Sequence, residues 1–107
     1  MPLYMDTHER VRAITMEGVT RAYERSLDVQ ARHGARYVKM WVHQDQADGD
    51  HGVMYCLIEA PTREAVVLVH LDAHGLLPND IYEVVEAPQE IPPGHRLERM
   101  QRSAVNA

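Results

Sequence analysis

Six segments of regular hydrophobic spacing follow one another along this chain, in the order strand, helix, strand, strand, helix, strand. The four strand segments either alternate between apolar and polar residues or are mostly apolar. They cover residues 3–8, 37–42, 53–60 and 81–86. The two helical segments each begin at a threonine placed to cap the helix and are followed by a glycine; they run from Thr15 to about His33 and from Thr62 to His74. This order leaves few topologies open to a single domain.

With right-handed crossovers, the βαββαβ order gives the split βαβ arrangement, also called ferredoxin-like. We therefore expect an α+β sandwich in which an antiparallel sheet of strand order 4-1-3-2 carries both helices on one face. This domain spans residues 1–87. From Pro88 onward the composition shifts to Pro, Gly, Arg, Gln and Glu, so residues 88–107 are predicted to be a polar tail, flexible or bound to a partner.

The second face of the predicted sheet has no helix to cover it. Strand alternation is expected to place five apolar or aromatic side chains there, namely Tyr4, Tyr37, Trp41, Tyr55 and Leu57. Such a face is too apolar to stay in water. We therefore expect a homodimer in which two sheets pack face to face.

Charge and composition argue against several classes of protein. Acidic residues outnumber basic ones 16 to 11, whereas nucleic-acid binders present a basic surface. No apolar run approaches the ~20 residues of a membrane span, and the first ten residues do not resemble a signal peptide. The single cysteine, Cys56, suits a reducing compartment. We expect a cytoplasmic protein that binds neither nucleic acid nor membrane.

Histidine is the residue whose abundance hints at chemistry, with seven in 107 residues. In the expected topology, connectivity brings five of the seven to one end of the molecule, together with several aspartates. This set comprises Asp6, His8, His43, Asp45, Asp48, Asp50, His51, His70, His74 and Asp80. His33 is expected at the opposite end and His95 in the tail.

Two spacings within this set favour a divalent metal ion. Asp6 and His8 are two residues apart on a strand, so both side chains leave the same face. His70 and His74 are one helical turn apart and can chelate one ion. Imidazole nitrogens completed by a carboxylate suit a borderline transition metal. The sequence therefore predicts His8, His70 and His74 as metal ligands, with Asp6 as a further ligand or as the acceptor that orients an imidazole.

A plainer interpretation competes with this one. A histidine pair near a helix end is commonly solvated, and His74 before Gly75 also favours the helix C-terminus through its dipole. There is a geometric objection as well. Asp6 and His8 are expected on the open face and the second helix on the other, so one ion reaches both pairs only if His8 bends over the sheet edge.

Other candidate residues are interpreted structurally. Cys56, in the middle of a strand, is expected to be a buried, inert thiol. Glu59 is expected to be exposed at an edge or ion-paired. The turn with Asp45, Asp48 and Asp50 lacks the glutamate of a calcium loop and is expected to be solvated.

Three stretches resemble a known family: the opening MPLYMDTH, the strand residues WV and YCLIEAP, and the segment VHLDAHGLLPNDIYEV. They are similar to a bacterial domain-of-unknown-function family that includes a cytoplasmic nickel-binding protein from actinobacteria. The similarity covers about residues 1–87. It implies a ferredoxin-like fold, a dimer and binding of nickel or a similar divalent ion. The turn at residues 43–51 and the tail depart from the family.

The leading hypothesis is a small cytoplasmic nickel-binding protein for metal sequestration or homeostasis, with no catalytic residue. The alternative, based on fold analogy, is a dimeric αβ-barrel enzyme of the oxygenase or isomerase kind. Its pocket would lie on the open face among Tyr4, Tyr37, Trp41 and Tyr55, with His8 or Glu59 as general base. A third hypothesis is an interaction module that uses the tail.

Overall fold

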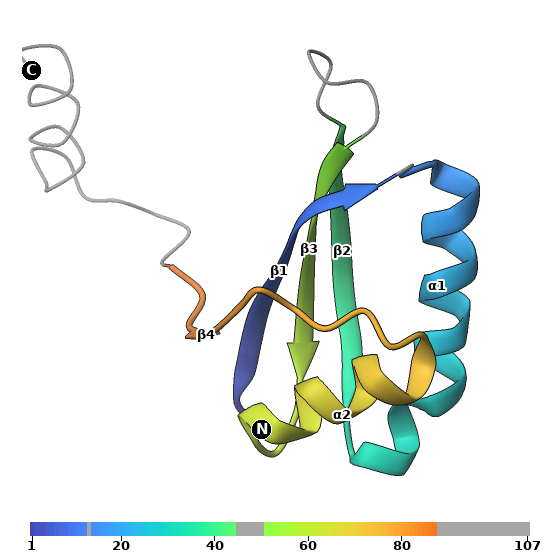
Figure 1. The fold of residues 1–107 in the computed structure, drawn as a ribbon. Coiled ribbons are helices and arrows are strands. Elements are labelled where there is room, and N and C mark those ends of the chain that lie inside the picture. Colours follow the sequence, from blue (N-terminus) through green and yellow to red (C-terminus); the bar gives the residue numbers. More distant parts are fainter. Residues whose placement is uncertain (13, 45–50, 88–107) are drawn as a thin grey trace, which may run out of the picture.

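Two helices pack against one face of a four-stranded sheet (Figure 1). This computed structural model describes residues 1–12, 14–44 and 51–87. The elements are β1 (Leu3–Arg12), α1 (Met16–Val29) with a 3-10 turn (Gln30–His33), β2 (Arg36–Gln44), β3 (His51–Glu59), α2 (Arg63–Ala73) and β4 (Asp80–Val84). The predicted tail and the turn at residues 45–50 lie outside the described residues.

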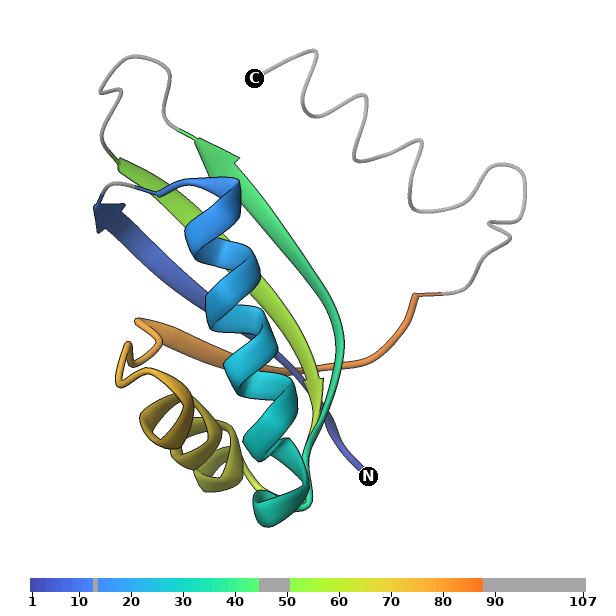
Figure 2. The same cartoon turned by 90° about the vertical axis from the view of Figure 1, so that its right-hand side faces the viewer.

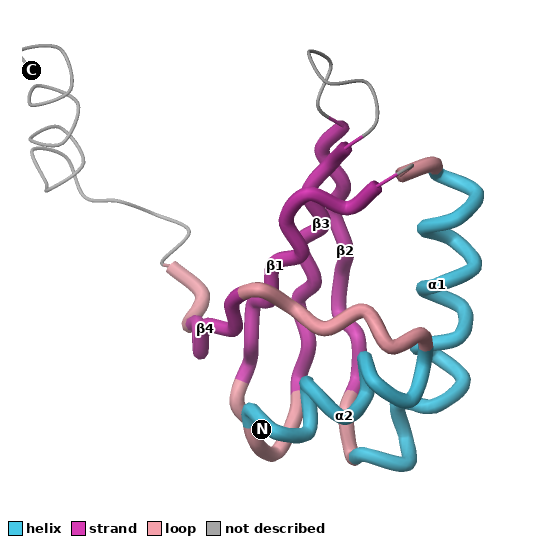
Figure 3. The backbone as a smooth tube through the Cα atoms, in the orientation of Figure 1, coloured by secondary structure: helices cyan, strands magenta, loops and turns pink. Residues whose placement is uncertain are grey.

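The sheet has the order β2-β3-β1-β4, and every neighbouring pair is antiparallel. Figure 2 shows both helices on the same side of this sheet. In Figure 3 the loop after α2 brings the chain back so that β4 lies along β1. The predicted ferredoxin-like arrangement and its strand order are confirmed. Within the described ranges, no helix is long and apolar enough to cross a membrane.

Both helices begin where the sequence predicts, and α2 also ends there, whereas α1 ends at Val29 and the 3-10 turn continues to His33. The Thr15 side chain accepts a hydrogen bond of 3.0 Å from the Gly18 amide, and the Thr62 side chain accepts one of 3.1 Å from the Ala65 amide. Gly34 follows the 3-10 turn with a φ of 65°, a left-handed conformation that glycine adopts without steric cost. The Thr62 cap fixes the start of α2, and His70 lies in the last turn of this helix with His74 at its C-cap.

The predicted face of Tyr37 is wrong, and a bulge in β2 explains why. The pairing of β2 with β3 slips by one residue between Tyr37 and Lys39. One extra residue in a strand reverses the alternation on either side of it. Tyr37 therefore faces the helices and is buried, whereas Trp41 stays on the open face, as predicted.

The predicted face of Tyr4, Asp6 and His8 is also wrong, although their alternation is correct. All three side chains are buried beneath the helices, and Leu3, Met5 and Thr7 point to the other face. Alternation separates the two faces of a strand but does not say which one the helices cover. The strand also runs four residues beyond His8, so this histidine lies inside the sheet and not at its edge.

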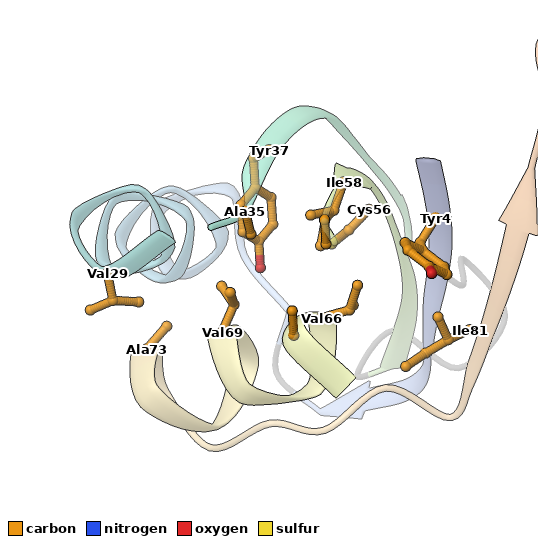
Figure 4. Packing of buried hydrophobic residues seen from close by; sticks show 12 residues of the cluster. Tyr4, Val29, Ala35, Tyr37, Cys56, Ile58, Val66, Val69, Ala73 and Ile81 are labelled. Atoms are coloured by element: carbon orange, nitrogen blue, oxygen red, sulfur yellow. The ribbon is translucent and has the colours of Figure 1, made fainter. Parts of the chain in front are cut away.

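The main core fills the space between the sheet and α2. Figure 4 shows Ile58 and Tyr4 from the strands facing Val66 and Val69 of α2. Ile58, Val66 and Val69 are fully buried. Asp6, His8 and His70 are 0%, 1% and 1% exposed, so the polar residues that the sequence singled out share this interior.

The other sheet face carries Trp41 and Tyr55, which are 40% and 37% exposed and stand opposite each other across β2 and β3. No helix or strand of the described residues covers this face. With Tyr4 and Tyr37 on the helix side, two of the four aromatic rings predicted to line an enzyme pocket here are missing. In place of Tyr4, β1 presents Leu3 and Met5 on the open face, so this face remains apolar.

Candidate metal centre

Strand β1 supplies two of the polar side chains in the interior. Asp6 and His8 are two residues apart, so both point toward α2. His8 Nε2 lies 3.1 Å from Asp6 Oδ1, without the geometry of a hydrogen bond. The sequence raised the objection that β1 and α2 present their candidate ligands on opposite faces of the sheet. The structure removes this objection, because both elements present them on the same face.

Helix α2 supplies His70, whose ring is held by its own helix. His70 Nδ1 donates a hydrogen bond of 2.7 Å to the Val66 carbonyl, one turn earlier. This bond requires a proton on Nδ1, so in the neutral ring Nε2 is the nitrogen that can bind a metal ion, the arrangement common to metal-binding histidines. Nε2 lies 3.4 Å from Asp6 Oδ2 and 3.4 Å from the Tyr37 hydroxyl.

Strand β3 supplies Cys56, which the sequence analysis did not count as a ligand. Cys56 stands directly opposite Asp6 in the β1–β3 pairing, and its side chain is 1% exposed. The potential ligand atoms of four buried residues lie within 4.8 Å of one another; these residues are Asp6, His8, Cys56 and His70. The strand register could have revealed this, because β1 and β3 are neighbours in the predicted sheet.

The electrostatics of the group favour a bound cation. Burial raises the pKa of Asp6, but the imidazoles of His70 and His8 outweigh burial, and the net pKa is lowered. Burial, together with the Asp6 carboxylate, raises the pKa of the Cys56 thiol. The group therefore holds an ionised carboxylate next to a thiol that only a strong electrophile such as a metal ion would deprotonate.

Several polar atoms of the group have no hydrogen-bond partner in the described part of the chain. They are both carboxylate oxygens of Asp6 and both ring nitrogens of His8. Buried polar atoms without partners are rare because each costs free energy. Coordination of one metal ion would satisfy the carboxylate and one imidazole nitrogen together, and an imidazole, thiolate and carboxylate set suits Ni²⁺, Zn²⁺ or Co²⁺. The residues fit a transition-metal ion.

His74, the fourth predicted ligand, lies beside this group. Its ring centroid is 5.6 Å from that of His70. Burial, and then the charges of His70, His8 and Arg25, lower the pKa of His74 to about 4. The ring accepts a hydrogen bond of 3.0 Å at Nδ1 from the Leu76 amide. The neutral ring therefore carries its proton on Nε2, and ligation through Nε2 requires that the hydrogen bond to Leu76 break.

The remaining histidines and carboxylates predicted at this end do not join the group. His43 pairs with Val53 near the end of β2, and His51 stands opposite Arg12 at the far end of β1. Asp45, Asp48 and Asp50 lie outside the described residues. Glu59 is ion-paired, as expected, with its Oε1 3.0 Å from Arg36 Nη2, so it is a poor candidate for a general base.

Comparisons with known proteins give one consistent result. The family model described as "Nickel responsive protein SCO4226-like" matches residues 4–84. The crystal structure of SCO4226 from Streptomyces coelicolor A3(2) is 30% identical in sequence, and the match covers 80% of this chain and 99% of that one with a TM-score of 0.67. No curated protein matches the chain.

Proposed function

The chain belongs to the family of nickel-responsive SCO4226-like proteins, and on that premise we propose that it is a small nickel-binding protein. The observation that carries this proposal is the buried group of Asp6, His8, Cys56 and His70. Its carboxylate and one of its imidazoles have no other partner among the residues described. The description of the matching family as nickel-responsive supports the choice of metal.

We assign different roles to the candidate ligands. His8 and His70 offer imidazole nitrogens and Asp6 a carboxylate, and Cys56 adds a thiolate that the sequence did not predict. His74 is proposed as an outer ligand, because it must give up its hydrogen bond to Leu76 before Nε2 can bind. His74→Ala should therefore weaken nickel binding less than His8→Ala.

The burial of the site favours a storage or buffering role over catalysis. Asp6, His8 and His70 are at most 1% exposed, so a bound ion is shielded from water and from substrates. We propose sequestration or homeostasis of nickel as the function. A cytoplasmic location is proposed with it, supported by a single cysteine that is free and buried.

Calorimetric titration of the metal-free chain with Ni²⁺ tests the proposal. We expect one ion per chain at pH 7.5 and affinity lower by about 100-fold at pH 5.5, because a thiol protonated at both values must release one proton on binding. The lowered pKa of Asp6 keeps its carboxylate ionised at both values, and His74, with its pKa of about 4, stays neutral. Weak binding without pH dependence would contradict the proposal.

We also propose that two copies pair through their open sheet faces, supported by the exposure of Trp41 and Tyr55 side by side. Light scattering should give twice the 12.2 kDa mass of one chain. Tyr55→Lys should give the monomer, because the charge would be buried at the centre of the interface. Leu68→Lys is the matched control, since Leu68 is exposed on α2. A monomeric unaltered chain would refute the pairing.

A further inference from the structure

A cavity lies next to the metal centre, between α1 from Gly18 to Arg25, the end of β1 and the end of α2. Its volume is about 220 Å³. Most of its wall is apolar, with Val19 and Ala22 from α1 and Met54 from β3. This volume is below the roughly 300–1,000 Å³ of pockets for drug-sized ligands, so only a small molecule fits.

Two arginines, Arg12 and Arg25, give the cavity its charge, and no acidic residue lines it. Neither guanidinium forms an ion pair within the structure as described. The other polar wall residue on α1, Thr15, already uses its hydroxyl to cap the helix. An apolar hollow with two unmatched positive charges is complementary to an anion with an apolar body.

His74 separates this cavity from the metal centre. It lines the cavity, and its ring contacts His70 on the other side. Asp6, His8, Cys56 and His70 do not line it. The cavity is therefore a neighbouring site with a lining of its own, which shares only the His74 ring with the surroundings of the metal centre.

We propose that this cavity binds a small monocarboxylate with a short apolar tail. The carboxylate pairs with Arg12 and Arg25, and the tail packs against Val19, Ala22 and Met54. Guanidinium groups suit carboxylates because their N–H donors match the two oxygens.

The test uses hexanoate as the probe and the full chain in a metal chelator, followed by NMR chemical shifts. Saturable binding should shift the amides of α1 near Ala22 and those near Leu76. Arg12→Gln/Arg25→Gln should weaken binding by about tenfold or more, because charge-assisted hydrogen bonds are lost. Arg21→Gln is the matched control for the change at Arg25: it is the same substitution on α1, at an exposed residue paired with Glu17, and should change binding less than twofold.

One further probe and one further variant test the roles of the ligand's charge and of its apolar tail separately. Hexanamide has the same tail without the charge and should bind at least about tenfold more weakly than hexanoate. Ala22→Leu should block the cavity and abolish binding by both probes while the amide spectrum stays that of a folded chain. Equal binding of hexanamide, an equal effect of Arg21→Gln, or no saturable binding of hexanoate would each overturn the proposal. All three measurements are made in a metal chelator, so their outcome does not depend on nickel.

Discussion

Replacing His70 with alanine is expected to abolish stoichiometric nickel binding and to lower the free energy of unfolding by about 3–5 kcal/mol. Both effects come from the position of the ring. His70 Nε2 faces the Asp6 carboxylate at 3.4 Å, and both side chains are at most 1% exposed. Without the imidazole, the buried carboxylate loses a partner and the core gains a cavity. Urea unfolding and calorimetry measure the two effects on the same sample.

His33→Ala is the matched control for this prediction. His33 Nε2 lies 3.0 Å from Asp72 Oδ2, in a more exposed pair that does not belong to the metal group. Loss of such a pair costs about 0–1 kcal/mol, and nickel binding should not change. If His70→Ala does not fold, Asp6→Asn tests the same site, because this substitution keeps the shape of the side chain and removes its charge. Unchanged nickel affinity in Asp6→Asn would exclude this group as the site.

The fold could be predicted from local signals because each one is independent of tertiary contacts. Thr15 and Thr62 cap their helices through bonds to residues three positions later. Gly34 and Gly75 both have a positive φ, which ends a helix whatever packs against it. With helix ends and strand segments fixed, right-handed connectivity leaves one arrangement for the sheet.

The faces of the strands could not be predicted in the same way. Tyr37 is on the helix side because of one bulge residue, and no local signal distinguishes a bulge from regular alternation. Tyr4 alternates correctly with Asp6 and His8, but alternation does not say which face of a strand the helices cover. A buried polar face is stable only when its members satisfy one another or bind an ion.

Three of the four residues in the buried group were therefore singled out from the sequence. Asp6, His8 and His70 come together as the connectivity of the fold requires. Cys56 was interpreted as inert because it lies in an apolar strand, and burial does raise its pKa. Its role depends on what stands opposite it, which is Asp6 in the β1–β3 register. A group assembled across two strands and a helix depends on strand pairing, and a single segment does not reveal it.

Saturating Ni²⁺ is expected to raise the melting temperature by about 15–30 °C at pH 7.5. A ligand at 1,000 times its Kd that binds only the folded state stabilises it by about 4 kcal/mol. Each kcal/mol raises the melting temperature of a domain of this size by about 4–8 °C. The site joins β1, β3 and α2, so it does not survive unfolding, and the full effect applies. Circular dichroism with and without the metal measures the shift.

Variants and other cations distinguish this site from scattered surface histidines. Mg²⁺ should give no shift, because it prefers oxygen ligands in an octahedral shell. His33→Ala should keep the full shift, since His33 lies outside the metal group. Cys56→Ser should reduce the shift and remove any thiolate-to-nickel absorption band, because a serine hydroxyl stays protonated and does not replace a thiolate. An equal shift in His70→Ala would mean that nickel binds elsewhere on the chain. An undiminished shift in Cys56→Ser would instead place the ion on Asp6, His8 and His70 and leave the thiol as a neighbour.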